Sequence, residues 1–300
     1  MLRLKGILPA LFTLYDSKGE VTDKGIEKFL AFLLDRGCTG FFVGGSTGEG
    51  LLQTVEERKR FIEATVKTVA GQTPVIAHVG ALATRDACEL ARFSAKVGAD
   101  AVGSVLPVYY PVGIDGTMAY YRAIAEAADR PLLIYYLAGA GSGPLNPVEF
   151  AEKLATLPHV FALKYTSPEL ETFGQVIELC GGKLNMVMGC DQLMLPALTL
   201  GATAAIGTTY NFMPEIFVGV YDAWKSGDLK TAQRLMARGF RVIHLVRRKY
   251  PPMEACKEIT RMRGFDIGRS RGPIPPISDK QRAELKKDLD AMDFFSDPIR

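Results

Sequence analysis

Short apolar runs alternate with longer amphipathic segments over the first two thirds of the chain. The apolar runs have the length of strands and are predicted at residues 6–11, 40–43, 74–79, 101–105, 132–136, 160–164, 184–188 and 204–206. The intervening segments repeat apolar residues at helical spacing, as Ile26, Phe29, Leu30 and Leu33 do. These predicted helices cover residues 22–36, 54–70, 84–97, 117–128, 147–157, 168–179 and 193–200.

Helix-end signals support these boundaries. Thr54 and Glu57 have the spacing of a capping box. Glycine ends several of the predicted helices, where a left-handed cap is expected: Gly37, Gly71, Gly98 and Gly201.

Eight strands that alternate with helices predict an α/β fold, the (β/α)8 TIM barrel. An open doubly wound sheet is the alternative, but no GxGxxG follows the first strand. After residue 210 the strands stop, and helices are predicted at residues 214–224, 229–247, 252–262 and 279–292. We therefore expect a barrel catalytic domain over residues 1–212 and a C-terminal helical region over residues 213–300, with a loop at residues 268–276.

Composition excludes several classes of partner. The net charge of +3 gives no strong field toward nucleic acid or a membrane surface. The basic run Arg247-Arg248-Lys249 is short, and we interpret it as a solvated helix end. No apolar run is long enough to span a bilayer, and the N-terminus lacks the pattern of a signal peptide. We expect neither nucleic acid nor a membrane as partner.

The cysteines and histidines point away from disulfides and metals. The five cysteines are scattered, odd in number and without a CxxC pair. The three histidines show no metal-binding spacing. This pattern fits a reducing cytoplasm and predicts no metal site.

Reactive groups of such barrels lie at the C-terminal ends of the strands. Four apolar residues, 160–163, run directly into Lys164. A lysine there is costly unless it is exposed, paired or used, and burial frees the amine as a nucleophile toward a carbonyl carbon. The alternative is a side chain that snorkels out of the core.

Other strand ends carry hydroxyl and tyrosine side chains that could act together with Lys164 in one reaction. After the second strand, residues 44–50 read Gly-Gly-Ser-Thr-Gly-Glu-Gly, which suits a carboxylate, or a phosphate. Tyrosines follow the fourth strand and end the fifth. An unprotonated Lys164 could condense with a 2-oxo acid whose carboxylate is held by Ser46 and Thr47, and a tyrosine could move the proton.

Three segments carry a resemblance to a known family. Residues 44–50, Leu163-Lys164-Tyr165-Thr166-Ser167 and residues 201–211 resemble the N-acetylneuraminate lyase and dihydrodipicolinate synthase family. The likeness covers nearly the whole chain, with the motifs in the family's order. It implies a class I pyruvate-dependent aldolase on a (β/α)8 barrel, without a cofactor and usually a homotetramer.

The resemblance also implies residue roles. Lys164 forms the imine with pyruvate, Tyr136 transfers the proton, and Tyr109 reaches into a neighbouring subunit's site. Ser46 and Thr47 bind the pyruvate carboxylate, and Thr47 also relays protons. The other expected substrate-binding positions are Thr166, Gly189, Asp191, Gln192, Ile206, Gly207 and Thr208.

The branch within the family depends on the second substrate. Gly141 stands where the synthase branch carries an arginine, which counts against dihydrodipicolinate synthesis. The Gly-Ser-Thr-Gly-Glu order and the Gly189-x-Asp191 pattern resemble the lyase branch. The chain departs from the family pattern at three places. Gln192 stands where the lyases have a glutamate, residues 137–140 stand where the family has Asn-Ile-Pro-Ala, and Thr208 stands where a serine is usual.

The expected function is therefore cleavage of a 2-oxo sugar acid to pyruvate and an aldehyde, with N-acetylneuraminate as first candidate. The first alternative is a 2-keto-3-deoxy sugar-acid aldolase or dehydratase, or an aldolase for a less polar aldehyde. A binding barrel without catalysis and a phosphate-binding barrel enzyme are further alternatives.

Overall fold

The computed structural model describes residues 2–139, 146–180 and 182–296. Its centre is one parallel sheet with neighbours in the order β1-β8-β7-β6-β5-β4-β3-β2. The two ends of this order also meet, because Leu11 N donates to Phe42 O at 2.8 Å and Ala10 bridges Phe42 in parallel. The sheet is thus closed into a barrel, which confirms the predicted fold and excludes the open sheet. The strands are β1 Gly6–Pro9, β2 Phe41–Val43, β3 Val75–His78, β4 Ala101–Val105, β5 Leu132–Leu137, β6 Val160–Thr166, β7 Asn185–Met188 and β8 Ala204–Gly207.

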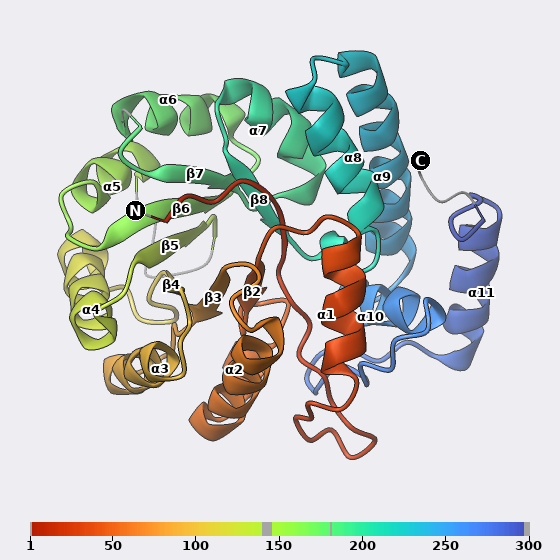
Figure 1. The fold of residues 1–300 in the computed structure, drawn as a ribbon, viewed down its shortest axis with the longest axis horizontal. Helices are drawn as coiled ribbons and strands as arrows, with labels where there is room; N and C mark the ends of the chain where they lie inside the picture. The colour runs from red at the N-terminus through yellow and green to blue at the C-terminus, as the bar shows by residue number, and fades with distance from the viewer. Residues whose placement is uncertain (1, 140–145, 181, 297–300) are drawn as a thin grey trace.

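Helices surround the strands (Figure 1). They are α1 Ile26–Asp35, α2 Val55–Val69, α3 Thr84–Lys96, α4 Gly113–Ala128, α5 Pro147–Leu154, α6 Leu170–Cys180, α7 Met194–Leu200 and α8 Pro214–Lys225. Helix α4 begins at Gly113, four residues before the predicted start at residue 117. The prediction missed this first turn because Gly113 and Gly116 have low helix propensity. The predicted caps are confirmed: Thr54 and Glu57 form a capping box. Gly37, Gly71, Gly98 and Gly201 all have positive φ.

Three further helices follow: α9 Leu229–Lys249, α10 Pro252–Met262 and α11 Asp279–Asp290. They lie beside α1 and α8 in Figure 1, on one flank of the barrel. Helix α8 follows β8 and contacts β1, so it takes the eighth place in the ring, although its residues fall in the predicted C-terminal region. The division at residue 212 stays a prediction.

Apolar residues fill two layers, one inside the barrel and one between strands and helices. Alternate residues of a strand point to opposite sides, so each strand supplies both layers. On β5, Leu133 and Tyr135 belong to the inner cluster, whereas Leu132, Ile134 and Tyr136 belong to or pack against the outer one. This alternation decides which tyrosine can reach a site inside the barrel.

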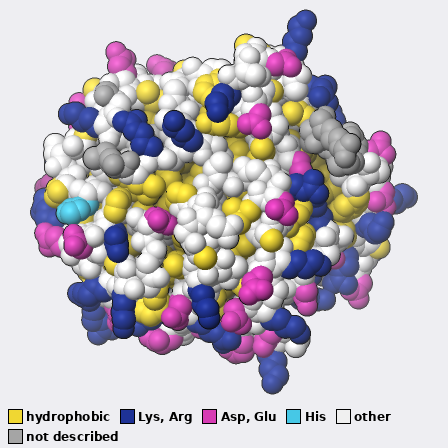
Figure 2. Space-filling view, in the orientation of Figure 1, with side chains coloured by type: hydrophobic (Ala, Val, Ile, Leu, Met, Phe, Trp, Pro, Cys, Tyr) yellow, Lys and Arg dark blue, Asp and Glu magenta, His cyan; other side chains and the backbone are white. Residues whose placement is uncertain are grey.

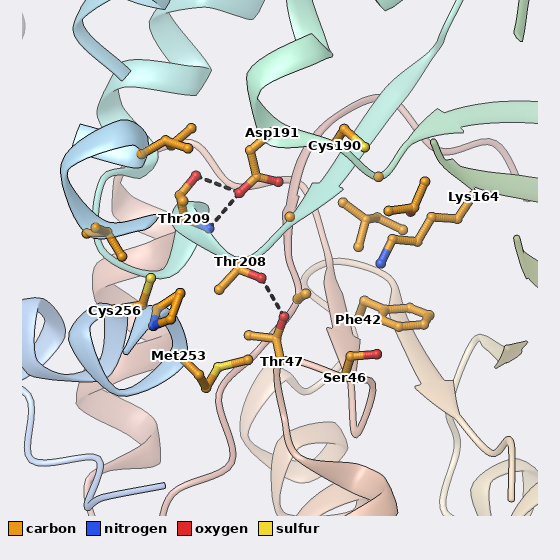
Figure 3. A pocket seen from close by; sticks show the side chains of 18 of the residues that line it. Phe42, Ser46, Thr47, Lys164, Cys190, Asp191, Thr208, Thr209, Met253 and Cys256 are labelled. Atoms are coloured by element: carbon orange, nitrogen blue, oxygen red, sulfur yellow. Dashed lines mark hydrogen bonds between the residues drawn. The ribbon is translucent and has the colours of Figure 1, made fainter. Parts of the chain in front are cut away.

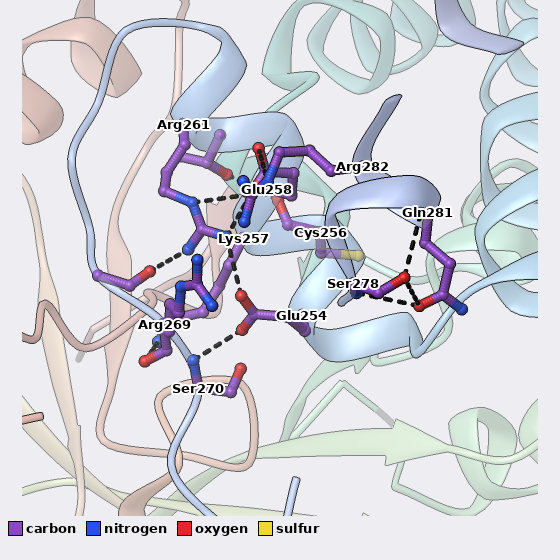
Figure 4. Close-up of polar contacts among 12 residues, drawn as sticks. Glu254, Cys256, Lys257, Glu258, Arg261, Arg269, Ser270, Ser278, Gln281 and Arg282 are labelled. Atoms are coloured by element: carbon purple, nitrogen blue, oxygen red, sulfur yellow. Dashed lines mark hydrogen bonds and ion pairs between the residues drawn. The ribbon is translucent and has the colours of Figure 1, made fainter. Parts of the chain in front are cut away.

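Charged side chains fix α10 to the loop that follows it (Figure 4). Arg261 Nη2 donates to Glu254 Oε1 at 2.8 Å and also to Glu258. Glu254 Oε2 accepts from the backbone N of Ser270 at 2.7 Å. The Arg261 contacts with Glu254 and Glu258 lie within α10. The bond from Ser270 N, together with one from Arg261 Nη1 to Gly268 O, holds α10 beside the predicted loop at residues 268–276, which contains no helix or strand.

The surface carries mixed charge. On the face shown in Figure 2, basic and acidic side chains are interspersed around the edge, and uncharged side chains fill the middle. This arrangement agrees with the small net charge of +3. Among the described residues no helix is long and apolar enough to cross a membrane.

Candidate functional site

A cavity of about 270 Å³ lies at the C-terminal ends of the strands. It brings together most of the residues expected from the sequence: Ser46, Thr47, Lys164, Thr166, Gly189, Asp191, Ile206, Gly207 and Thr208 all line it. They come from the ends of four strands, β2, β6, β7 and β8, or from the loops that follow them. Figure 3 shows several of them, together with side chains from α10.

Lys164 lies inside the barrel. Its side chain comes from β6, and the residue is 5% exposed. The Nζ atom lies 3.8 Å from the centre of the Tyr135 ring and 4.9 Å from that of Phe42. Among the described residues it has no carboxylate partner within salt-bridge distance. The snorkelling alternative is therefore wrong, and the amine is buried against aromatic faces, where it is free to react.

Tyr135, not Tyr136, faces Lys164. The two strands pair in register as Tyr135 with Lys164 and Tyr136 with Tyr165, so Tyr136 points out of the barrel. Its ring stacks on Tyr165 at 5.2 Å, whereas Tyr135 lines the cavity. The proton-transfer role that the resemblance implied for Tyr136 is therefore not supported by its position, because strand alternation puts Tyr135, the first of the two adjacent tyrosines, inside the barrel.

Residues 44–50 form the loop that closes one side of the cavity. Ser46 is exposed, and Thr47 is buried with its Oγ1 2.7 Å from Thr208 Oγ1. This pair links the loop after β2 to the end of β8. The hydroxyl groups of Ser46 and Thr47 thus lie in one cavity with Lys164, as carboxylate binding requires.

His78 and Arg58 support this loop, and sequence reasoning missed both. His78 Nε2 accepts from Val105 N at 3.1 Å, so the proton of the neutral ring is on Nδ1, which donates to Gly44 O at 3.1 Å. Burial, with the charge of Arg58, holds the pKa of His78 well below its usual value. Arg58 donates to His78 O and Gly80 O. A histidine at the end of β3 was the only available signal in the sequence.

Two glycines make room for side chains of the site. A Cβ on Gly189 would lie 1.8 Å from Thr166 Oγ1 and 3.0 Å from Lys164 Cε. A Cβ on Gly207 would lie 1.8 Å from Asp191 Oδ1. Neither position tolerates a side chain without displacing a cavity residue. The Thr166 Oγ1 is buried and has no hydrogen-bond partner among the described residues, so it is available to a ligand.

Asp191 lines the cavity, whereas Gln192 does not. Asp191 is buried, and its Oδ2 accepts from Thr209 N at 2.8 Å and from Thr209 Oγ1 at 2.7 Å. Burial raises the pKa of Asp191 although these hydrogen bonds lower it. Gln192 does not line the cavity, and its Oε1 instead accepts from Arg247 Nη2 at 3.3 Å. A direct contact of Gln192 with substrate is therefore not supported, because its side chain turns toward α9.

The side of the cavity formed by α9 and α10 was not foreseen. It contains Ile243, Val246, Arg247, Pro252, Met253 and Cys256. In Figure 3, Met253 and Cys256 stand across Thr208 and Thr47 from Lys164. Arg247 is exposed in the last turn of α9, as the sequence predicted, and the packing of α9 also brings it to the cavity.

Two expectations are not tested within this chain. Tyr109 is 81% exposed, has a φ of 78° and does not line the cavity. Its ring contacts Tyr110 edge-on at 4.9 Å. Its role at a neighbouring subunit's site stays a prediction. Gly141, the position of the synthase arginine, lies outside the described residues.

Among the described residues, no group of three or more His, Cys, Asp or Glu side chains is placed to hold a metal ion. Cys190 and Cys256, which line the cavity, both have a pKa raised by burial. They are therefore protonated thiols near neutral pH.

The chain is similar to known proteins along nearly its whole length. The model of the Dihydrodipicolinate synthetase family matches residues 3–292. An N-acetylneuraminate lyase of Rhizobium meliloti is 32% identical over 286 residues, 95% of this chain and 94% of that protein. The structure of an N-acetylneuraminate lyase from Aliivibrio salmonicida has a TM-score of 0.91 at 28% identity and covers 99% of both chains. A dihydrodipicolinate synthase from Bacillus anthracis has the same TM-score at 27% identity, covering 97% of this chain and 99% of that chain.

Proposed function

The chain belongs to the dihydrodipicolinate synthetase family, and from this premise we propose that it cleaves a 2-oxo sugar acid to pyruvate and an aldehyde. It is a class I pyruvate-dependent aldolase, similar to N-acetylneuraminate lyases. The observation that carries the proposal is the buried Lys164 amine, which has no acidic partner among the described residues and shares its cavity with Ser46 and Thr47.

In the proposed reaction, the Lys164 amine attacks the carbonyl carbon of the 2-oxo acid and water leaves as the imine forms. Ser46 and Thr47 hold the substrate carboxylate. A base removes the proton of the C4 hydroxyl, and the bond between C3 and C4 breaks. The protonated imine accepts the electron pair and becomes an enamine, and C4 departs as the aldehyde carbon. The enamine then takes up a proton, and hydrolysis releases pyruvate and the free amine.

Proton transfer to and from the substrate needs a side chain close to the Lys164 amine. The Tyr135 side chain lines the cavity, and its ring lies against the Lys164 amine. We assign to Tyr135 the role that the resemblance gave to Tyr136. General acid–base groups must lie within hydrogen-bond reach of the reacting atoms, which Tyr136 does not satisfy from the outer face of β5.

N-acetylneuraminate is the first candidate substrate, because the similar relatives are N-acetylneuraminate lyases. The apolar side of the cavity formed by α9 and α10, and the turn of Gln192 toward α9, favour testing other 2-oxo acids with it. Assembly as a homotetramer and a cytoplasmic location are predictions from the resemblance and from the cysteine pattern.

Borohydride trapping tests the core of the proposal. Reduction in the presence of pyruvate is expected to leave a stable adduct on Lys164, detected by peptide mass spectrometry. Reduction without pyruvate is the control. Lys153, on the outer helix α5, serves as an internal control for nonspecific labelling. Labelling of Lys153 to the same extent as Lys164, or no adduct at all, would contradict the imine mechanism.

A pair of tyrosine variants tests the assignment on β5. Tyr135→Phe removes the hydroxyl inside the cavity and is expected to lower kcat by about 10²- to 10⁴-fold, the usual contribution of a general acid or base. Tyr136→Phe removes only a hydroxyl on the outer face, so kcat should change less than about threefold by the same reasoning. Steady-state rates of pyruvate release measure both. The reverse order of effects would restore Tyr136.

A further inference from the structure

One cation in the cavity has no function in the imine chemistry. Among the described residues of the cavity lining, Arg247 is the only basic one apart from Lys164. It lies in the last turn of α9, and its side chain is exposed. An arginine at this position can meet a ligand that enters the cavity.

Arg247 forms no direct ion pair in the described part of the chain, although its charge acts on the Asp191 carboxyl, where burial raises the pKa and Arg247 opposes part of this shift. Among the residues that the structure describes, its one hydrogen bond goes to Gln192 Oε1, an uncharged amide, and no carboxylate lies within salt-bridge distance. The acidic residue of the lining, Asp191, is buried and bonded to Thr209. A guanidinium carries five N–H donors, so most of them stay free for a ligand.

The cavity side chains beside Arg247 on α9 and α10 offer few hydrogen-bond partners to a ligand. The neighbouring cavity side chains from α9 and α10 are apolar or weakly polar: Ile243, Val246, Pro252, Met253 and Cys256. Such a surface gives a hydroxylated chain few hydrogen-bond partners, and desolvated hydroxyls without partners lose binding free energy. A short apolar chain that ends in a carboxylate matches both the apolar wall and the guanidinium fork.

We propose that Arg247 binds an anionic group at the end of the substrate remote from the imine carbon, so that this aldolase prefers a 2-oxo acid with a second acidic group. Gln192 is a positioning residue that orients the guanidinium through its 3.3 Å hydrogen bond. This inference rests on the proposed function, since it takes the 2-oxo carbonyl to be at Lys164.

Matched 2-oxo acids test the inference without needing turnover. The acidic probes are 2-oxoglutarate, 2-oxoadipate and 2-oxopimelate, and each is paired with the monoacid of equal carbon number, from 2-oxopentanoate to 2-oxoheptanoate. Borohydride trapping on Lys164 at increasing probe concentration gives a half-saturation value for each. At one chain length or more, the acidic probe is expected to saturate at about 10- to 100-fold lower concentration, as a charge-assisted hydrogen bond implies.

Arg247→Met keeps a flexible unbranched side chain, although a shorter one, and removes the charge. The ratio of the half-saturation values of the neutral and the acidic probe should therefore fall to within about threefold of one. Arg248→Met, one residue further along α9 and outside the lining, is the matched control and should keep the wild-type ratio. Half-saturation by pyruvate should stay unchanged in Arg248→Met. Equal trapping of acidic and neutral probes by the wild type, or a preference that survives Arg247→Met, overturns the inference and leaves the proposed function standing. Absence of any pyruvate adduct in the wild type overturns both.

Discussion

Replacing Lys164 by methionine is expected to abolish the aldolase reaction, with kcat lowered at least about 10⁴-fold, or about 5 kcal/mol of transition-state stabilisation. Methionine has nearly the shape of lysine but cannot form an imine. The borohydride adduct with pyruvate should disappear at the same time. Rates of pyruvate release and peptide mass spectrometry measure the two effects.

The same variant should not lose stability. Lys164 is 5% exposed and pairs with no acid among the described residues. Burying its charge therefore lowers the stability of the fold. Its cation–π contacts with Tyr135 and Phe42 offset part of this unfavourable term. We expect an equal or higher free energy of unfolding in urea. A loss of more than about 2 kcal/mol, the size typical of a core defect, would show that Lys164 has a structural role instead.

Lys257→Met is expected to have the opposite pattern, with the free energy of unfolding lowered by about 3–5 kcal/mol. The side chains of Lys257 and Glu49 are fully buried, with Lys257 Nζ 2.7 Å from Glu49 Oε1. Burial lowers the pKa of Lys257, while the Glu49 carboxylate opposes this shift. Without the lysine, the Glu49 carboxylate is buried without a counter-ion. Urea titration followed by circular dichroism measures the loss.

A double variant separates this cause from poor packing of methionine. Lys257→Met combined with Glu49→Gln removes both charges, and an apolar or neutral replacement of a buried pair is often close to neutral. The double variant should therefore recover most of the stability that the single variant loses. If it is as unstable as the single variant, the ion pair is not the reason for the defect.

These two lysines show what a sequence does and does not reveal. Lys164 follows a run of strand residues, so its place at a barrel strand end could be predicted. Lys257 lies in an ordinary amphipathic helix, and nothing near it in the sequence identifies Glu49, 208 positions away, as its partner. Its carboxylate partner is fixed only when α10 packs beside the loop after β2.

The wrong choice between Tyr135 and Tyr136 has a related reason. Strands of a barrel are buried on both faces, so residues 132–136 read Leu-Leu-Ile-Tyr-Tyr without any polar alternation. The pattern predicts the strand, but it does not show which of its residues point into the barrel. Pairing of Tyr135 with Lys164 in the register between β5 and β6 decides this.

The sequence by itself determined the barrel, the lysine at the end of the sixth strand and the loop that holds Ser46 and Thr47, because these follow from local periodicity and from motifs at strand ends. The tertiary structure decided the far side of the cavity. Arg247, Met253 and Cys256 reach it from α9 and α10, which come after the last strand in the chain. Their positions depend on helix packing between distant segments, and such packing leaves no periodic signal in the sequence.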